Sequence, residues 1–483
     1  FDNTEGGDGD GNSTSSSNIF AAATQVAPIY PLFIRDKNGK IMIDANGNTM
    51  YDYGDGGNAG LQRPSFGKSN ALSDAILNTR ATEGNTINGT AFAEISFLKD
   101  FKFTTTNSVY VDESRLTTVT NPYYGSYASS NGILGKTHSR RYSTNYQQLL
   151  NYVKAIGSHN ITAMIGHEYY RTQYYYTFGS KSNMFDPSNH ELAGAVTDGS
   201  SNSYTTDYNT EGYFARAQYN FDEKYYASAS YRRDASSRFH PDNRWGNFWS
   251  FGASWRISQE DFMENLTWVD NLKLRASYGE TGNDAIYYTD DDTQQDYYPY
   301  QTLYNLGINN GLEAGLYFPT MANNNLKWET QVSTDVALEF GLFGRLNGTV
   351  EFFRKASRDL LFNVSQPLSS GVEKIVQNIG KVRNQGVEID LNYQVLKSKD
   401  WKLSVGANAT FINNKVTRLP DANRKDGIIK DSKKLMEGHS IYEFWLRQWW
   451  GVNPDNGDGL YIFDAENNTD ANGNIKDAVK KTL

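Results

Sequence analysis

The sequence contains no cysteine in its 483 residues, which rules out disulfides, thiol nucleophiles and thiolate metal sites. This absence suits an exported protein, because no thiol is available to be misoxidised. Long apolar runs are missing too, and none approaches the roughly 18 residues of a membrane-spanning helix. A chain of this kind that enters a bilayer must therefore do so with β-strands.

Basic patches and catalytic motifs are also missing. The formal net charge is −9 and charges of both signs are interspersed, which leaves no basic face for nucleic acid. No nucleophile elbow, phosphate loop or H-E-x-x-H motif occurs, and the acidic run at residues 290–292 is a solvated loop rather than an acid/base pair. The six histidines lack metal-ligand spacing: His138, His159, His167, His190, His240 and His439. We predict no enzymatic activity, no cofactor and no metal site.

Aromatic residues are abundant, at 14% of the chain, and they follow a period of two. In residues 213–221, tyrosine, alanine and phenylalanine at the odd positions alternate with Phe214, Arg216, Gln218 and Asn220. The odd face is small in its middle and aromatic at its ends, as expected of a strand that faces a bilayer. The same alternation recurs at residues 225–232, 249–257, 272–278, 346–355, 387–395 and 403–411.

The links between these strands alternate in length. Short links are predicted at residues 99–100, 155–159, 222–224, 343–344 and 397–400, with a somewhat longer one at residues 258–270. Long polar links are predicted at residues 113–139, 179–210, 235–246, 281–327, 357–384 and 416–438. The pattern predicts an all-β fold, a large antiparallel transmembrane β-barrel with short periplasmic turns and long extracellular loops, and about 12 to 14 of its strands follow residue 90.

We divide the chain into three parts. Residues 1–88 form an early loop and strand region of the barrel, which starts with a flexible tract rich in Gly, Ser and Asp. Residues 89–452 form the main run of transmembrane strands and extracellular loops. Residues 453–483 form a late loop, and closure of the barrel is not included.

Several segments resemble one family, the SusC/RagA-type TonB-dependent outer-membrane transporters of Bacteroidetes. The resemblance is strongest in "SSRFHPDNRWGNFWSFGASWRISQEDFM" at residues 236–263 and "LKLRASYGETGND" at residues 272–284. These two segments match the family's Asn-Arg-Trp-Gly turn, a strand ending in Trp-Arg-Ile, and a Leu-Lys-Leu-Arg strand ending in Gly-x-x-Gly-Asn. Further matches follow in family order at residues 27–57, 324–361, 378–395 and 438–461.

The resemblance implies active import across the outer membrane. The nutrient would be an oligosaccharide or an oligopeptide, a SusD-like surface lipoprotein would act as a lid, and TonB-ExbB-ExbD would supply energy through a plug domain. The plug, the energy-coupling box and the closing strands of the family have no counterpart in this sequence. We therefore interpret the chain as an internal part of a longer protein, whose barrel has about 22 strands.

Tyrosines of the long links are the candidates for substrate binding, because their rings can stack on sugar rings or peptide side chains. The alternative is that they pack loops against one another or against the lipoprotein. For Trp445, which lies close to Trp449 and Trp450 in the sequence, the alternative to a binding cavity is an aromatic girdle at the membrane interface. The candidate residues are Tyr123, Tyr124, Tyr287, Tyr288, Tyr297, Tyr298 and Trp445.

Two further interpretations concern loops. Asp, Asn and Gly are frequent at residues 36–48 and 453–459, as in calcium loops, but neither run has the acidic twelfth position of an EF-hand, and we predict ordinary turns. We expect Arg238, Arg244 and Trp245 to fix an outer turn through salt bridges and stacking.

The alternatives to a transporter are a secreted or outer-membrane binding or adhesion protein and, third, an all-β glycoside hydrolase.

Overall fold

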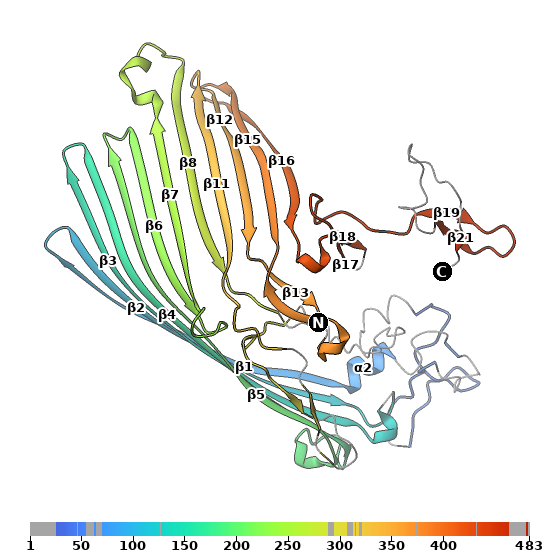
Figure 1. Ribbon diagram of the computed structural model, residues 1–483. Coiled ribbons are helices and arrows are strands. Elements are labelled where there is room, and N and C mark those ends of the chain that lie inside the picture. The colour runs from blue at the N-terminus through green and yellow to red at the C-terminus, as the bar shows by residue number, and fades with distance from the viewer. Residues whose placement is uncertain are drawn as a thin grey trace. The chain divides into compact units, whose positions relative to one another are not determined.

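Antiparallel strands dominate the computed structural model (Figure 1). It describes residues 26–45, 47–54, 62–63, 70–125, 127–287, 294–306, 313, 315–317, 321–372, 374–430, 432–462 and 480–481. Within these residues one 12-stranded sheet has the order β1 (Thr79–Phe97), β2 (Phe101–Thr120), β3 (Ile133–Ile156), β4 (His159–Met184), β5 (Ala195–Phe221), β6 (Tyr225–Ser236), β7 (Trp245–Arg256), β8 (Val269–Asn283), β11 (Glu329–Leu342), β12 (Leu346–Arg358), β15 (Lys381–Lys397) and β16 (Lys402–Arg418). The long strands thus pair in the order in which they occur along the chain.

Shorter elements occupy the remaining segments. The helix α2 (Ala71–Leu77) precedes β1. The 3-10 turns are η1 (Ala128–Ser130), η2 (Leu192–Gly194), η3 (Ile257–Gln259), η4 (Asp261–Met263), η5 (Leu368–Ser370) and η6 (Asp421–Asn423). The small sheets are β9 (Asn305–Leu306) with β10 (Leu316–Tyr317), β13 (Leu361–Ser365) with β14 (Lys374–Asn378), β17 (Ile428–Lys430) with β18 (Lys433–Leu435), and β19 (Trp449–Val452) with β20 (Gly459–Ile462) and β21 (Lys480–Lys481). No helix in the described part of the chain is long and apolar enough to cross a membrane.

Five of the short links are tight hairpin turns, as predicted, whereas the longer link between β7 and β8 contains the 3-10 turns η3 and η4. The turn between β5 and β6 has two consecutive residues with positive φ, Asp222 at 53° and Glu223 at 54°. The turn between β11 and β12 does the same with Phe343 and Gly344, at 59° and 61°. Two successive left-handed residues match the right-handed twist of the flanking strands, so these turns fix the register of each hairpin.

Two of the long links are shorter than predicted, and the strands beside them are longer. The prediction that residues 113–139 and 179–210 are loops was wrong for most of their length, since β2 runs to Thr120 and β5 begins at Ala195. The reason is that antiparallel pairing satisfies the backbone whatever the polarity of the side chains. Alternating hydropathy marks only the part of a strand that has one apolar face.

The chain forms two compact units, each with a small core. The first unit comprises Phe1–Phe92, Thr106–Tyr146 and Tyr170–Asn209, and the second comprises Ala93–Thr105, Gln147–Tyr169 and Thr210–Leu483. In the first unit the buried cluster is Val119, Leu134, Met184 and Ala195. In the second unit it is Phe239, Ile286, Leu326 and Val376, with Trp328 and Leu361 packed against it. The first cluster lies at the ends of β2, β3, β4 and β5, whereas the second lies in the links after β6 and β8, in the link before β11 and in β14.

Candidate functional site

One face of the strands in the second unit carries exposed apolar side chains. Phe251 is 53% exposed and Phe411 is 65% exposed, although both are large and apolar. Exposure on this scale marks a surface that meets something other than water. We call this surface the apolar belt, and its large members are Tyr219, Trp249, Phe251, Leu274, Val336, Leu338, Val350, Phe352, Leu391, Tyr393, Leu403, Val405 and Phe411.

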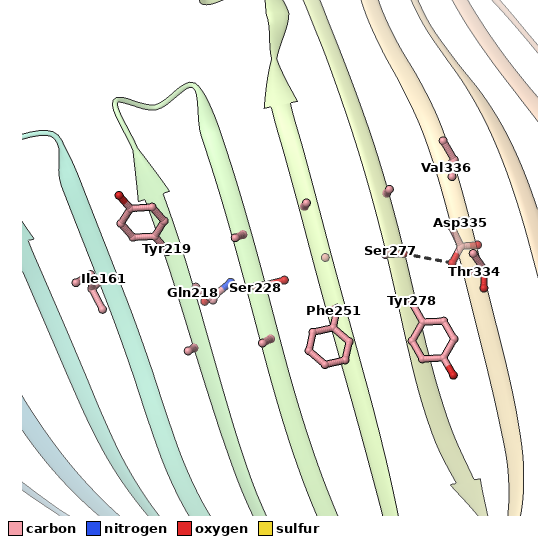
Figure 2. Close-up of a pocket in the computed structure, with 16 residues that line it drawn as sticks. Ile161, Gln218, Tyr219, Ser228, Phe251, Ser277, Tyr278, Thr334, Asp335 and Val336 are labelled. Atoms are coloured by element: carbon pink, nitrogen blue, oxygen red, sulfur yellow. Dashed lines mark hydrogen bonds between the residues drawn. The ribbon is translucent and has the colours of Figure 1, made fainter.

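The middle of the apolar belt is a shallow groove of about 820 Å³, shown in Figure 2. Small side chains line its floor, and the rings of Tyr219, Phe251 and Tyr278 stand around it. The alanines pair across strands, because Ala253 of β7 lies opposite Ala227 of β6 and Ala276 of β8. Alanine in the middle and aromatic rings around it is the arrangement that the sequence pattern predicts for a lipid-facing surface.

The opposite face of the same strands is polar and charged. Arg275 of β8 donates from Nε to Oε1 of Glu339 at 2.9 Å and also forms an ion pair with Glu351. Lys273 reaches the other oxygen of Glu339 at 3.3 Å. A pocket of about 470 Å³ on this face is lined by amide, hydroxyl and cationic side chains, among them Gln218, Ser228, Lys273 and Arg275. We call this surface the polar face, and it is chemically suited to contact with a polar solute.

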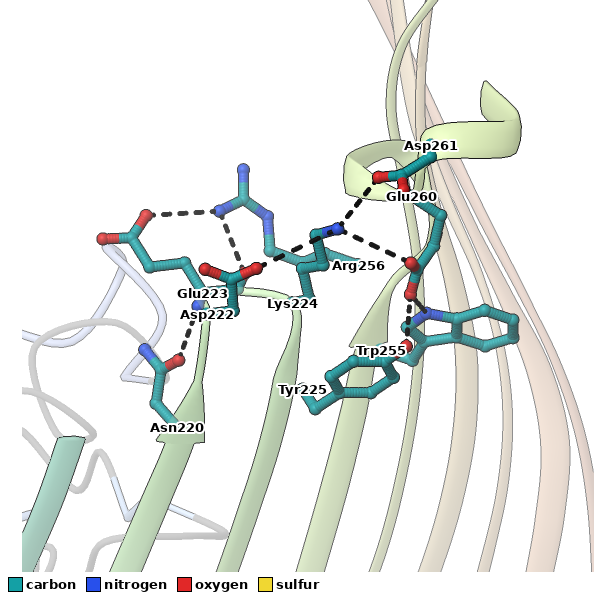
Figure 3. Close-up of polar contacts among 9 residues, drawn as sticks. All are labelled: Asn220, Asp222, Glu223, Lys224, Tyr225, Trp255, Arg256, Glu260 and Asp261. Atoms are coloured by element: carbon teal, nitrogen blue, oxygen red, sulfur yellow. Dashed lines mark hydrogen bonds and ion pairs between the residues drawn. The ribbon is translucent and has the colours of Figure 1, made fainter. Parts of the chain in front are cut away.

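A polar cluster fixes one end of the strands β6 and β7, at the turn before β6 (Figure 3). Glu260 accepts hydrogen bonds from the Tyr225 hydroxyl at 2.5 Å and from Nε1 of Trp255 at 2.8 Å. Its carboxylate lies 3.7 Å from Nζ of Lys224, and Asp261 lies 3.4 Å from the same ammonium. The hydrogen bond from Tyr225 is the main reason that the pKa of Glu260 lies below its usual range. These hydrogen bonds fix the rings of Tyr225 and Trp255 through the tyrosine hydroxyl and the indole N–H.

The predicted site residues Tyr123 and Tyr124 lie in the link after β2. The hydroxyl of Tyr124 donates to Oδ2 of Asp44 at 2.8 Å, and its ring stacks on Tyr53 with 5.9 Å between centroids. Burial is the main cause of the raised pKa of the Tyr124 hydroxyl. The backbone amide of Tyr123 donates to the Asn121 side chain at 3.0 Å. Tyr124 therefore makes its closest contacts within its own unit.

Of the predicted residues in the link between β8 and β11, Tyr297 and Tyr298 contact neighbouring residues, whereas Tyr287 is exposed. Arg238 lies over the ring of Tyr297 with 5.0 Å between Cζ and the centroid. The backbone amide of Tyr298 donates to Oδ1 of Asp296 at 2.8 Å, and burial raises the pKa of that carboxyl. Tyr287 is 41% exposed. Tyr288 lies outside the described residues.

The predicted residue Trp445 follows β18 and is 40% exposed. The ammonium of Lys434 lies 3.9 Å from the centroid of its ring, which is a cation–π contact. Its backbone amide donates to the carbonyl of Ser432 at 2.7 Å. The structure does not bring Trp445 together with the predicted tyrosines in any contact among the described residues.

Arg238 forms a salt bridge beside the turn after β6, as expected from the sequence. Its guanidinium lies 3.4 Å from Oδ1 of Asp284 and donates to the Asp284 carbonyl at 3.0 Å. The Ser236 hydroxyl donates to the other oxygen of Asp284 at 2.6 Å. Arg244 contributes through its carbonyl, which accepts a hydrogen bond from Nε1 of Trp328 at 2.8 Å. In the same hairpin, Arg233 lies over Trp245 at 5.1 Å.

The two Asp/Asn/Gly runs form ordinary turns. Oδ1 of Asp36 accepts the backbone amides of Asn38 and Lys40, each at 2.9 Å. Oδ1 of Asn453 accepts the amide of Asp455 at 3.0 Å. These are the local hydrogen bonds of Asx turns. Among the residues described by the structure, no group of three or more His, Asp or Glu side chains is arranged to hold a metal ion.

The sequence reasoning missed a row of tyrosines on β4 and β5. Tyr204 stacks on Tyr176 with 5.0 Å between ring centroids and lies 6.2 Å from Tyr174. Tyr170 and Tyr208 meet edge to face at 6.4 Å. We call these five residues the tyrosine strip. The available signal was the run "YYRTQYYY" at residues 169–176, but its partners on β5 fell in the segment that was predicted to be a loop.

Comparisons with known proteins agree with this geometry. The family of TonB dependent receptor-like β-barrels matches residues 33–479. The chain is 30% identical over 342 residues to TonB-dependent receptor P3 of Formosa agariphila, covering 66% of this chain and 33% of that protein. It is 28% identical over 358 residues to TonB-dependent receptor SusC of Bacteroides thetaiotaomicron, covering 71% of this chain and 34% of that protein.

A solved structure shows the same fold. The RagAB peptide transporter superposes with a TM-score of 0.76 and 26% identity, over 91% of this chain and 47% of the matched chain. The present chain thus spans about a third of the length of the curated relatives and just under half of the RagAB chain. The chain belongs to the TonB dependent receptor-like β-barrel family and is of the SusC/RagA type.

Proposed function

We propose that this protein imports a large nutrient, an oligosaccharide or an oligopeptide, across the outer membrane in a TonB-dependent manner. The observation that carries the proposal is the two-faced sheet. An apolar belt with aromatic rings suits contact with lipid, while the polar face of the same strands suits a water-filled interior. The proposal gives the chain no catalytic role.

The proposed partners follow from the likeness to SusC and RagAB. A SusD-like surface lipoprotein caps the outer side, where the long links lie. TonB-ExbB-ExbD supplies energy through a plug domain, and the apolar belt supports the proposal that the protein is a multi-pass β-barrel of the outer membrane. These assignments are supported by the family match over residues 33–479 and by the fold shared with RagAB.

Uptake measurements test the proposal with the full-length protein in its native cells. Fluorescently labelled pools of neutral oligosaccharides and of oligopeptides are supplied to cells with the gene, without it, and without TonB. We expect uptake of one pool to require both genes. Binding to the cell surface without TonB-dependent uptake would instead identify a binding or adhesion protein.

The proposed partner is tested separately. The full-length protein is extracted from outer membranes in detergent and purified by a tag, and the proteins that accompany it are identified by mass spectrometry. We expect a surface lipoprotein in stoichiometric amount. Purification of the protein alone under several mild detergents would contradict the assigned lipoprotein partner.

A further inference from the structure

A group of cations continues the apolar belt on the three adjacent strands β12, β15 and β16 (Figure 1). Phe352 of β12 and Phe411 of β16 belong to the belt, and both lie opposite Val387 of β15 in the register. Side chains at every second position of a strand share a face. The same face therefore continues toward the long links through a set of basic residues. We call this set the cationic rim, and its members are Arg354, Arg358, Lys381, Arg383 and Lys415.

The register of the sheet sets cations of the cationic rim directly opposite one another. Arg358 of β12 lies opposite Lys381 of β15. Arg383 of β15 lies opposite Lys415 of β16. Residues directly opposite on antiparallel strands have Cβ atoms about 4.5–5.5 Å apart, and like charges in such a pair destabilise the sheet. Without a neutralising partner, both pairs therefore lower the stability of the protein.

Carboxylates do not neutralise the cationic rim within the part of the chain that the structure describes. There, its members form no ion pair with an acidic side chain, and Nε of Arg383 is buried without a hydrogen-bond partner. Acids nearby in the sheet have other partners. Glu280 of β8 accepts a hydrogen bond from the Tyr278 hydroxyl at 2.6 Å, and Asp421 lies 3.7 Å from Arg418. The cationic rim thus keeps an unbalanced positive charge.

The cationic rim adjoins the apolar belt. The guanidinium of Arg358 interacts electrostatically with the hydroxyl of Tyr278, one of the rings around the groove of the belt. On β15 the alternate apolar positions run from Val387 to Val395, which is about 26 Å of strand. A tilt of about 40° reduces this length to a thickness of roughly 20 Å, close to the apolar band of an outer-membrane barrel. The cations therefore begin where the apolar layer ends, on the side of the long links.

We propose that the cationic rim binds the phosphate groups of a phosphorylated lipid in the outer leaflet, a proposal that rests on the proposed function in the outer membrane. The phosphates bridge the facing cations and cancel their repulsion, while the acyl chains lie on the apolar belt. Arginine binds phosphate through two parallel N–H donors, and lysine binds it as a point charge. A free anion or an acidic protein segment would satisfy the cations without using the apolar surface beside them.

Lipid titrations of the full-length protein test the proposal. The protein is purified in a neutral detergent, with any lipoprotein that accompanies it, and is stripped of lipid. It is then titrated with lipid A that carries two phosphates, with the same lipid A after dephosphorylation, and with inorganic phosphate. Native mass spectrometry counts the bound lipids, and thermal unfolding measures the stabilisation. We expect saturable binding and stabilisation by the phosphorylated lipid A alone.

Arg358→Gln combined with Lys415→Gln removes one cation from each facing pair. We expect this double variant to bind lipid A roughly tenfold more weakly or worse, since each lost contact is a charge-assisted hydrogen bond. In the absence of lipid, we expect its melting temperature to equal or exceed that of the wild type, because the like-charge repulsion is gone. A purely structural role of the two side chains would instead lower the melting temperature with and without lipid.

Lys355→Gln is the matched control. Lys355 lies on β12 between Arg354 and Arg358 in the chain, but the alternation of the strand turns it to the other face, where its ammonium lies 5.9 Å from the ring centroid of Phe353. We expect its affinity for lipid A to stay within about twofold of wild type. Heat-dependent gel mobility shows whether each variant is folded.

Four results would overturn the proposal. They are equal lipid A affinity of the double variant and the wild type, equal binding of dephosphorylated lipid A, full stabilisation by inorganic phosphate alone, and a co-purifying acidic protein that the double variant loses in place of lipid. The third would identify a site for a free anion, and the fourth a protein interface.

Uptake measurements distinguish failure of this proposal from failure of the import function. A wild-type protein that supports TonB-dependent uptake but does not retain phosphorylated lipid A would refute the lipid site and leave import standing. Wild-type cells without TonB-dependent uptake would contradict import. Selective lipid A binding by the protein from those cells, weakened in the double variant, would still support the cationic rim.

Discussion

The guanidinium of Arg238 lies between Asp284 and the ring of Tyr297, 3.4 Å from the carboxylate and 5.0 Å from the ring centroid. Arg238 is only 3% exposed, so this contact is desolvated. It joins the loop after β6 to the loop after β8. We expect the two loops to keep this conformation only while Arg238 keeps its contacts with Asp284 and Tyr297.

Arg238→Ala is expected to destabilise the loops by about 3 kcal/mol, because it leaves the Asp284 carboxylate largely buried without this partner. The measurement is limited proteolysis of the full-length protein, with cleavage sites mapped in residues 284–328. The control is Lys327→Ala, which removes an exposed ion pair with Asp359 and is expected to cost less than about 1 kcal/mol. Equal protease sensitivity of the two variants would show that the buried contact is dispensable.

Gly282→Ala is expected to cost about 1–3 kcal/mol, because the added Cβ would overlap the ring of Phe248. That ring is only 6% exposed and lies 5.6 Å from Trp328, so it has little room to move. Thermal unfolding of the purified protein measures the change. Gly279→Ala in the same strand places its Cβ 3.6 Å from Ser250 and is expected to be neutral.

A charge in the apolar belt is expected to be costly. Ala229→Arg places a cation on the lipid-facing side of β6 and is expected to cost about 2–4 kcal/mol. Ser228→Arg, one residue away on the polar face, is expected to cost less than about 1 kcal/mol. Urea titration of the full-length protein in phospholipid vesicles compares the two variants. If Ser228→Arg proved the more costly, the assignment of the two faces would have to be reversed.

Asp74 in α2 makes stability depend on pH. Burial raises the pKa of its carboxyl to about 6, so the folded protein favours the neutral acid. The resulting stabilisation is fully present below the unfolded pKa of about 3.9 and is lost as pH rises through 6. We expect the melting temperature of Asp74→Asn to change less between pH 5 and pH 7.5 than that of the wild type. The exposed-site control Asp198→Asn should retain the wild-type difference.

The sequence predicts the hairpins of the second unit well. Residues 215–221 and 249–257 alternate strictly because one side of each strand contacts an apolar phase and the other does not. The turn at residues 222–224 is short and polar, so the sequence also predicts its position. Both features depend on neighbours in the sequence, which is why one sequence is enough to find them.

The candidate site was harder to predict, because it depends on pairing between distant segments. Residues 195–209 are polar on both sides, so their alternation carries no hydropathy signal, and their place in β5 follows from the backbone pairing of the sheet. The contact between Tyr204 and Tyr176 could not be found without that pairing. Arg238 stood out in the sequence, but its buried partner Asp284 lies 46 residues away.

The lengths of β4 and β5 have a consequence for how a solute approaches the membrane. With 26 and 27 residues at about 3.3 Å each, these strands extend over roughly 85 Å, whereas the apolar band of an outer-membrane barrel is only about 25 Å tall. Even with strong tilt, more than half of each strand must stand in water. On the proposed function, a nutrient would begin to shed its hydration on this projecting ribbon, well before it reached the level of the lipid.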